Sequence, residues 1–354
     1  MSTPSPATGA EPRTRSSLTV DVAVASAHTK GWPQRHAQGL VPDRFPYGLD
    51  RLADHDLEPR LLDVGVPRPL ERASGKLLDG LRFGRSWRGT GPLLTWEERL
   101  GVPALAAVGG SRPVVSGVVW ATDGGSAAAQ AVTRRYLRRA GRLFVLSTAQ
   151  LPVLERWGLR APQVQYVPQG IDTDFWTERP VAAATGTVAS VGNDRHRDYA
   201  TLAAAWPQIL RADPGADLTV ATTREVAAGP RSRTVQLDHV ALREQVYRRA
   251  AVVVVPLVPN VHCSGLTASL EAMACGVPVV VTRTAGMEDY VADGETGLLV
   301  PPGDPAALAA AVSGLLADPD RAAAMGRAAA ERVRQRFSTA RMAADLACLV
   351  REAA

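Results

Sequence analysis

Short apolar runs alternate with longer segments of helical pattern along most of the chain. In the N-terminal half, the pattern predicts strands at Leu18–Ala25, Pro59–Val64, Leu93–Trp96, Val114–Trp120 and Leu143–Ser147. It predicts helices at Tyr47–His55, Ser126–Ala140 and Thr148–Gly158, and a polar, aromatic loop at His28–Pro46. Strands that alternate with helices indicate a parallel α/β sheet with both faces covered.

The alternation restarts after the segment PQGIDTDFWTERP, residues 168–180. The pattern predicts further strands at Thr187–Val191, Leu218–Ala221, Ala251–Val255, Val277–Val281 and Leu298–Val300. It predicts helices at Asp198–Ala212, Ala241–Ala250, Leu266–Cys275, Pro305–Leu316, Asp318–Phe337 and Ser338–Glu352. We therefore predict two Rossmann-like α/β domains that face each other across a cleft, where small molecules bind.

These patterns divide the chain into a disordered leader (residues 1–17), two domains (18–175 and 176–337) and a last helix (338–354). The leader is rich in Ser, Thr, Pro and Arg and lacks helical amphipathicity, which makes a transit peptide the weaker alternative. No apolar run reaches the roughly 18 residues of a transmembrane helix. A chain of 354 residues suits two domains of ordinary size.

The net charge of +5 comes almost entirely from arginine, since Lys30 and Lys76 are the two lysines. Together with abundant Ala, Gly and Pro, this bias is typical of a GC-rich genome and indicates an actinobacterial source. The charge permits an anionic substrate or peripheral contact with acidic lipid. The sequence has no interleaved basic and aromatic run, so we expect no nucleic-acid partner. Its three cysteines have no paired spacing, which favours the reducing cytoplasm.

The stretch from Val255 to Thr282 carries the clearest chemistry. A buried strand ends at Val255, and a loop with Ser264 and Gly265 leads into a helix that begins near Leu266. Free N–H groups at a helix start carry about half a positive charge and bind anions such as a diphosphate. Glu271 follows one turn later, where its carboxylate can accept two hydrogen bonds from ribose hydroxyls.

This stretch resembles the nucleotide-sugar site of retaining GT-B glycosyltransferases of family four, also called group 1. The resemblance rests on four motifs in order: PQGIDTDFW, SVGNDRHRDYATLAAAW, SGLTASLEAMACGVPVVVT and AGMEDYVADGETGLLVPPGDPAAL. It implies that Glu271 binds ribose and that the backbone of Gly265, Leu266 and Thr267 binds the diphosphate. It also implies an acceptor-binding N-terminal domain and a last helix that crosses back to that domain. We expect no metal or cofactor, because the helix start and the arginines can neutralise the diphosphate without an ion.

Two departures from the family pattern affect the predicted donor site, and a third affects the acceptor side. Cys263 stands where the family has a glutamate that contacts the donor sugar, so the sugar is left open. Asn193 stands where the family has a phosphate-binding arginine, while Arg197 aligns with the family's lysine and Arg195 is free to replace the arginine. The third departure is on the acceptor side, where the glycine-rich loop and the PVV-x-x-x-H segment are not clearly present. We include Ser264 and His262 among the donor-binding candidates, and for His262 a bond to a loop carbonyl is an equal alternative.

Two acidic residues are candidates for catalysis on the acceptor side. Glu97 and Asp123 follow predicted strands and could orient an acceptor hydroxyl or take its proton. A structural role, as a helix cap or ion-pair partner, is an equal alternative for each. The triplets Asp54-His55-Asp56 and Asp172-Thr173-Asp174 allow a metal interpretation, which we rank below one without metal because such triplets recur by chance.

We therefore predict a cytoplasmic glycosyltransferase that moves a sugar from a nucleoside diphosphate to an acceptor hydroxyl or amine. The acceptor is a small molecule, a glycan or a lipid-linked molecule. Two alternatives bind the same donor. One is a catalytically degenerate partner subunit, suggested by Cys263, and the other is a GT-B sugar-nucleotide epimerase or hydrolase.

Overall fold

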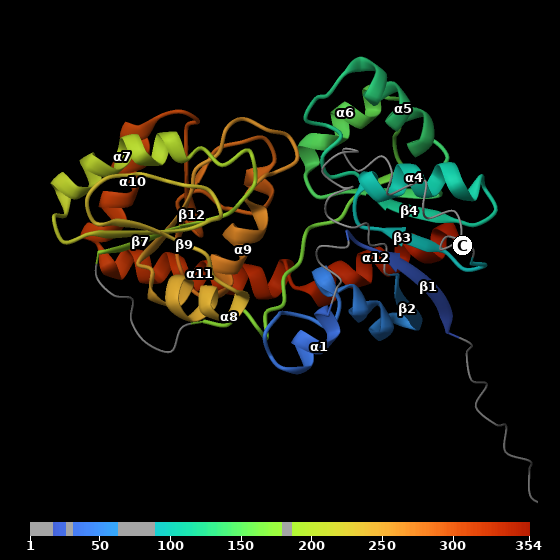
Figure 1. Ribbon diagram of the computed structural model, residues 1–354, viewed down its shortest axis with the longest axis horizontal. Helices are drawn as coiled ribbons and strands as arrows, with labels where there is room; N and C mark the ends of the chain where they lie inside the picture. The colour runs from blue at the N-terminus through green and yellow to red at the C-terminus, as the bar shows by residue number, and fades with distance from the viewer. Residues whose placement is uncertain (1–16, 26–30, 63–88, 179–185) are drawn as a thin grey trace, which may run out of the picture.

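The computed structural model describes residues 17–25, 31–62, 89–178 and 186–354. Within these residues, two six-stranded sheets form the centres of two α/β domains that lie side by side (Figure 1). All strand pairs are parallel, so the predicted fold class is confirmed. The predicted leader, apart from its last residue, lies outside the described residues.

The N-terminal sheet has the strand order β2-β1-β3-β4-β5-β6. Strands β3 and β4 are buried along their whole length because helices cover both faces of the sheet. The strands are β1 (Leu18–Ala23), β2 (Leu57–Leu62), β3 (Leu93–Thr95), β4 (Val114–Gly117), β5 (Arg142–Val145) and β6 (Val164–Tyr166). The helical segments are α1 (Trp32–Ala37), η2 (Pro46–His55), α4 (Glu98–Val108), α5 (Ala127–Leu137), η3 (Thr148–Gln150) and α6 (Leu151–Arg156).

The C-terminal sheet has the strand order β12-β11-β10-β7-β8-β9. Its central strand β10 is a run of four valines, all buried, as a strand covered on both faces requires. The strands are β7 (Thr187–Val191), β8 (Asp217–Ala221), β9 (Ser232–Val235), β10 (Val252–Val255), β11 (Val279–Thr282) and β12 (Gly297–Val300). The helical segments are α7 (Tyr199–Ala212), α8 (His239–Ala241), η4 (Leu242–Val246), η5 (Tyr247–Arg249), α9 (Leu266–Ala274), η6 (Met287–Asp289), α10 (Pro305–Ala317) and α11 (Pro319–Arg336).

Local side-chain chemistry determines where the long C-terminal helices begin. The carboxylates of Asp198, Asp304 and Asp318 each accept a hydrogen bond from a backbone N–H in the first turn of α7, α10 and α11. Pro305 and Pro319 occupy first helical positions, where the missing N–H costs nothing.

The last helix, α12 (Thr339–Ala353), packs against η2, β4 and β5 of the N-terminal domain. In Figure 1, α11 runs beneath the C-terminal sheet and α12 continues beneath the N-terminal one. The Thr339 hydroxyl donates to Asp43 Oδ1 at 3.2 Å, and Arg142 Nε lies 3.0 Å from Glu352 Oε2. These contacts join the end of the chain to its first domain.

Three local predictions were wrong. The segment His28–Pro46, predicted as a loop, contains the helix α1. The predicted helix Tyr47–His55 is a 3-10 segment with left-handed backbone at Tyr47 and Gly48, and the predicted helix Ala241–Ala250 consists of short α, π and 3-10 turns. Each segment makes contacts with distant residues that compete with the local pattern: Trp32 of α1 packs edge-on against His239, η2 packs against α12, and Arg243 of η4 donates to the Phe175 carbonyl. None of the helices in the described parts of the chain is long and apolar enough to cross a membrane.

Candidate functional site

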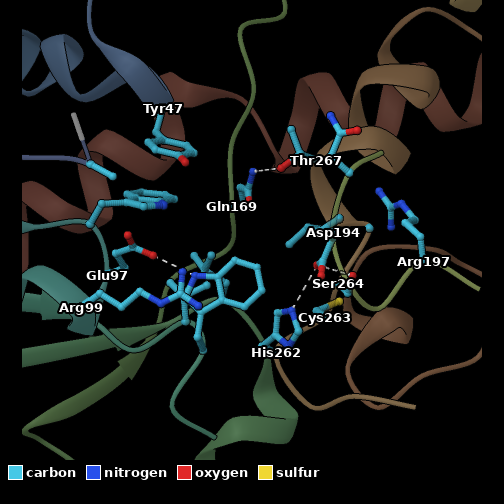
Figure 2. A pocket seen from close by; sticks show the side chains of 18 residues that line it. Tyr47, Glu97, Arg99, Gln169, Asp194, Arg197, His262, Cys263, Ser264 and Thr267 are labelled. Carbon is cyan, nitrogen blue, oxygen red and sulfur yellow. Dashed lines mark hydrogen bonds and ion pairs between the residues drawn. The ribbon is translucent and has the colours of Figure 1, made fainter. Parts of the chain in front are cut away.

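Two adjoining cavities lie between the domains, at the carboxyl ends of the strands. The central cavity, of about 270 Å³, is lined by both domains, including the whole predicted stretch from His262 to Thr267. The adjoining cavity, also of about 270 Å³, contains Glu271 and shares Tyr47, Gln169 and Thr267 with the first. Each is large enough to hold part of a small organic ligand. In Figure 2, Tyr47, Glu97 and Arg99 face Asp194, Arg197 and His262 across the central cavity.

The start of α9 opens directly onto the central cavity. Gly265 precedes the helix with a φ of +86°, and no side chain caps its first turn. A Cβ atom at this position would lie 2.6 Å from both Arg197 Nη1 and Val255 Cγ1. The glycine therefore lets the helix start approach the cavity closely. The Leu266 N–H donates to the Cys263 carbonyl at 3.3 Å, so the N–H groups of Gly265 and Thr267 are the ones that remain for an anion among the three predicted.

Arg197 is the buried cation beside this helix start. Its Nε donates to the Val191 carbonyl at 3.1 Å, whereas its Nη1 is buried without a hydrogen-bond partner. Burial lowers the pKa of its guanidinium from the usual value. Since burying an unpaired polar nitrogen is costly, Nη1 is available for an anionic ligand in the cavity.

The second predicted phosphate ligand, Arg195, is exposed and lines neither cavity. The structure therefore does not place it where the missing family arginine would be needed. Asn193 lines the central cavity, and its Oδ1 accepts hydrogen bonds from Thr222 and Thr223, which orients its amide group.

Glu271 lies one turn into α9, with 8% of its surface exposed, in the adjoining cavity. Its Oε2 accepts a hydrogen bond from the Tyr247 hydroxyl at 2.8 Å. Burial raises the pKa of this carboxyl to about 7. A carboxylate held in this way, next to the aromatic side chains of Trp32 and Trp176, can accept hydroxyl hydrogen bonds from a nucleoside.

Cys263 and Ser264 lie in the loop before α9. Cys263 is buried, and burial raises the pKa of its thiol well above the usual value, so the sulfur is a neutral group rather than a nucleophile. Ser264 donates its hydroxyl hydrogen to Asp194 Oδ2 at 2.6 Å, and its N–H donates to Asn260 Oδ1 at 2.8 Å. Leu266 adds an apolar wall to the same cavity.

Asp123 does not line either cavity. Its carboxylate, from the loop after β4, accepts hydrogen bonds from the Val261 N–H at 2.5 Å and from Nδ1 of His262. These contacts join the N-terminal domain to the loop before α9. The carboxylate is thus already engaged, and Asp123 acts here on His262 rather than on a group in the cavity.

Asp194, His196 and His262 form a polar cluster at the wall of the central cavity. His196 Nδ1 lies 3.2 Å from Asp194 Oδ1, and His262 Nε2 lies 3.5 Å from Asp194 Oδ2. Burial acts to raise the pKa of Asp194, but hydrogen bonds from His262 and Ser264 hold it below the usual range. Sequence reasoning missed Asp194 and His196 because nothing in the spacing of two such residues within an arginine-rich loop distinguishes them from surface charges.

On the opposite wall, Glu97 accepts a hydrogen bond from Trp120 Nε1 at 2.8 Å, and the Arg99 guanidinium lies 4.8 Å from the Trp120 ring centre. Tyr47 stacks on Trp96 with ring centres 4.1 Å apart. Together these side chains make a wall of aromatic faces with one acid and one base, which suits a polar ligand with an apolar face.

The neighbouring Glu98 is structural. Its carboxylate accepts hydrogen bonds from the backbone N–H groups of Val119 and Trp120. In the triplet Asp172-Thr173-Asp174, the first residue has a structural role. The Asp172 carboxylate accepts hydrogen bonds from the backbone N–H groups of Asp43, Asp174 and Phe175. The Asp54-His55-Asp56 triplet closes η2 and lines neither cavity.

The sequence of this chain is similar to those of known glycosyltransferases over part of its length. Residues 184–318 match a family model described as "Glycosyl transferases group 1". A GDP-mannose-dependent α-(1-6)-phosphatidylinositol monomannoside mannosyltransferase from Mycolicibacterium smegmatis is 31% identical over 55% of this chain and 59% of its own length. A D-inositol 3-phosphate glycosyltransferase from Segniliparus rotundus is 31% identical over 47% of this chain and 42% of its own. The alignments thus span about half the length of these relatives.

Solved structures match over nearly the whole chain. A sucrose-phosphate synthase from Thermosynechococcus elongatus superimposes with a TM-score of 0.71 at 22% identity, covering 94% of this chain and 98% of its own. The Anabaena protein HepE, in complex with UDP-glucose, gives a TM-score of 0.67 at 15% identity over 93% and 98%. These similarities show the GT-B arrangement of two Rossmann-like domains.

Proposed function

We propose that this chain, whose residues 184–318 belong to the group 1 glycosyltransferases, transfers a sugar from a nucleoside diphosphate to an acceptor hydroxyl or amine. The observation that carries the proposal is the arrangement of an uncapped helix start, a buried arginine with an unpaired nitrogen, and a buried glutamate around two joined cavities. These groups match the diphosphate and the ribose of one extended ligand.

The diphosphate lies in the central cavity, against the N-terminus of α9 and Arg197. The nucleoside extends into the adjoining cavity, where Glu271 accepts hydrogen bonds from the ribose hydroxyls. As the glycosidic bond breaks, negative charge builds on the departing phosphate. Donors that are already fixed by the fold stabilise this charge without reorganising.

The sugar faces the aromatic wall of the N-terminal domain, and the acceptor approaches from the same side. Glu97 is the acid that the N-terminal domain contributes to the lining of the central cavity, on the side from which the acceptor approaches. Retention of the anomeric configuration completes the proposal on the strength of the family resemblance, and a location in the cytoplasm rests on the unpaired spacing of the cysteines.

The position of Cys263 favours a second candidate. A buried thiol cannot replace the hydrogen-bonding capacity of a carboxylate toward sugar hydroxyls. A catalytically degenerate partner subunit would therefore bind the nucleotide and transfer no sugar. The third candidate, an epimerase or hydrolase, would consume the donor in the absence of any acceptor.

A thermal-shift screen of the full chain against UDP-, GDP-, ADP- and TDP-sugars tests the proposal. We expect one nucleotide series to raise the melting temperature, because a ligand that binds only the folded state stabilises it. Transfer assays with that donor then separate the candidates. Turnover that requires an acceptor supports the transferase, turnover without one supports the epimerase or hydrolase, and binding without turnover supports the partner subunit. No shift with any donor contradicts all three.

A further inference from the structure

A third cavity, of about 440 Å³, lies within the C-terminal domain and shares no lining residue with the two cavities of the candidate site. Its lining includes the first residues of three neighbouring strands, Thr187 of β7, Asp217 of β8 and Ser232 of β9. Since these strands are parallel, their first residues mark the edge of the sheet opposite to the carboxyl ends, where the candidate site lies. The cavity is therefore a separate site, and its volume is typical of cavities that bind small molecules.

Small side chains and an irregular helical segment create this cavity. Ala189, Thr219 and Arg233 are paired across β7, β8 and β9, and therefore share one face of the sheet. The segments η4 and η5 pack over this face and contribute Gln245 and Arg249 to the lining. Their π and 3-10 turns replace the regular helix that the sequence pattern predicts, and π turns within helices are frequent at functional sites.

Three arginines and one carboxylate give the cavity an excess of positive charge. Arg231 is paired with Asp217, with 2.9 Å between Nη2 and Oδ2. Arg233 uses only its Nε, which donates to the Thr219 hydroxyl at 3.1 Å, and Arg249 has no hydrogen bond or ion pair with any of the described residues. The two Nη groups of Arg233 and the whole guanidinium of Arg249 are thus available for an anion. Guanidinium groups match the oxygens of a phosphate with pairs of hydrogen bonds.

The segment that covers this cavity also contacts the predicted ribose ligand. Val246 lines the third cavity, and the next residue, Tyr247, donates its hydroxyl hydrogen to Glu271 Oε2 at 2.8 Å. This hydrogen bond acts to lower the pKa of Glu271 and so favours the carboxylate, the form that accepts hydrogen bonds from hydroxyl groups. A ligand that fixes η4 and η5 in this arrangement therefore acts on the donor site through Tyr247.

We propose that the third cavity binds a small phosphate monoester, and that this ligand raises the affinity for the nucleoside diphosphate through Tyr247. A phosphate monoester carries about −1.5 to −2 charges at neutral pH, which matches the two unpaired arginines, Arg233 and Arg249. Hydroxyl and amide groups of Ser232 and Gln245 face the polar remainder of such a ligand. The binding site is independent of the proposed function, and only its effect on nucleotide affinity rests on that function.

Calorimetry on the full chain with glycerol 3-phosphate, and with glycerol as the uncharged probe, tests the binding site. We expect saturable binding of glycerol 3-phosphate and none of glycerol. The double variant Arg233→Gln/Arg249→Gln should weaken this binding at least about tenfold, because it removes both unpaired guanidinium groups. Its matched control is Arg211→Gln/Arg327→Gln, which removes two exposed arginines that line none of the three cavities and should bind as the wild type does.

Each contrary outcome has a distinct meaning for the site. Arg233 and Arg249 are exposed, so their replacement should leave the fold intact. Equal losses in the two double variants would show attraction by net charge alone and overturn the proposal, as would the absence of binding to the wild type. Binding that Arg197→Gln abolishes and Arg233→Gln/Arg249→Gln leaves unchanged would place the ester in the central cavity, which also overturns it.

A second titration measures the affinity for UDP and GDP with and without saturating glycerol 3-phosphate. We expect the ester to raise the affinity for the nucleotide that binds at least about fivefold in the wild type, and to leave it unchanged in Tyr247→Phe, which still binds the ester. Nucleotide affinity that stays constant or falls overturns the coupling and leaves the proposed function intact, and an equal rise in Tyr247→Phe overturns the route through Tyr247. Binding of the ester by a chain that binds no nucleotide would contradict the proposed function and leave the third cavity as a phosphate site.

Discussion

At the scale of single residues, the candidate site depends on charged side chains that are buried at a cost. Glu271 and Arg197 both lie in low-dielectric surroundings, and burial shifts the pKa of each toward its neutral form. A ligand that brings hydroxyl donors to one and negative charge to the other removes part of that cost. Their burial is therefore a property of the binding site and not of the core alone.

Replacement of Glu271 tests its assignment to the ribose. Glu271→Ala removes charge-assisted hydrogen bonds worth about 1.5–3 kcal/mol each, so the affinity for the nucleoside diphosphate should fall roughly tenfold or more. Calorimetry with UDP and GDP measures the change. Glu288→Gln, which alters an exposed carboxylate in η6, is the control and should leave affinity unchanged. Equal affinities for the wild type and Glu271→Ala would exclude this role.

At the scale of elements, the loop and helix from Cys263 to Gly276 could be predicted well from the sequence. A buried valine strand, a glycine and an apolar helix follow one another in the chain, so local pattern alone determines them. The cluster of Asp194, His196 and His262 could not be predicted, because it forms from the loops after β7 and β10, which the C-terminal sheet brings together. The position of Arg195 was also beyond prediction, since a one-residue difference along a loop decides whether a side chain points inward.

Gly265 provides the test at this scale. Gly265→Ala forces a side chain into left-handed backbone and places its Cβ 2.6 Å from Arg197 Nη1 and Val255 Cγ1. We expect a loss of stability of about 1–3 kcal/mol and a weaker affinity for the diphosphate. Gly314→Ala, inside α10, is the matched control, because a Cβ atom at this position would meet nothing within 4 Å. This substitution should stabilise the chain slightly, since alanine favours a helix more than glycine does. Urea denaturation of both variants measures the difference, and similar effects would contradict the close approach.

At the scale of the whole molecule, a buried junction joins both domains and the last helix. Asp43 lies there with 4% of its surface exposed, and it bonds to Arg51 Nε at 3.0 Å and to the Thr339 hydroxyl at 3.2 Å. Its N–H donates to Asp172 in the segment between the domains. Burial and the nearby Asp172 charge raise the pKa of Asp43 to about 7.

This raised pKa predicts a dependence of stability on pH. The unfolded carboxyl releases its proton near pH 4, whereas the folded one keeps it until about pH 7, so the folded state binds more protons between these values. Stability should therefore fall as pH rises from 4 to 7, with a contribution of a few kcal/mol from Asp43. Asp43→Asn removes this contribution, and urea denaturation across the pH range should give a shallower slope. An unchanged slope would mean that Asp43 is ionised in the folded protein.

The central claim is that a nucleoside diphosphate binds across the joined cavities, with its phosphates against Arg197 and the start of α9. Calorimetry with Arg197→Gln and Arg195→Gln tests it most directly, because the two arginines are two residues apart and only Arg197 lines the cavity. We predict that Arg197→Gln lowers the affinity for the nucleoside diphosphate at least about tenfold and leaves the affinity for the free nucleoside almost unchanged. Arg195→Gln should bind both ligands as the wild type does. Equal losses for the two variants, or for the nucleoside and its diphosphate, would contradict the account.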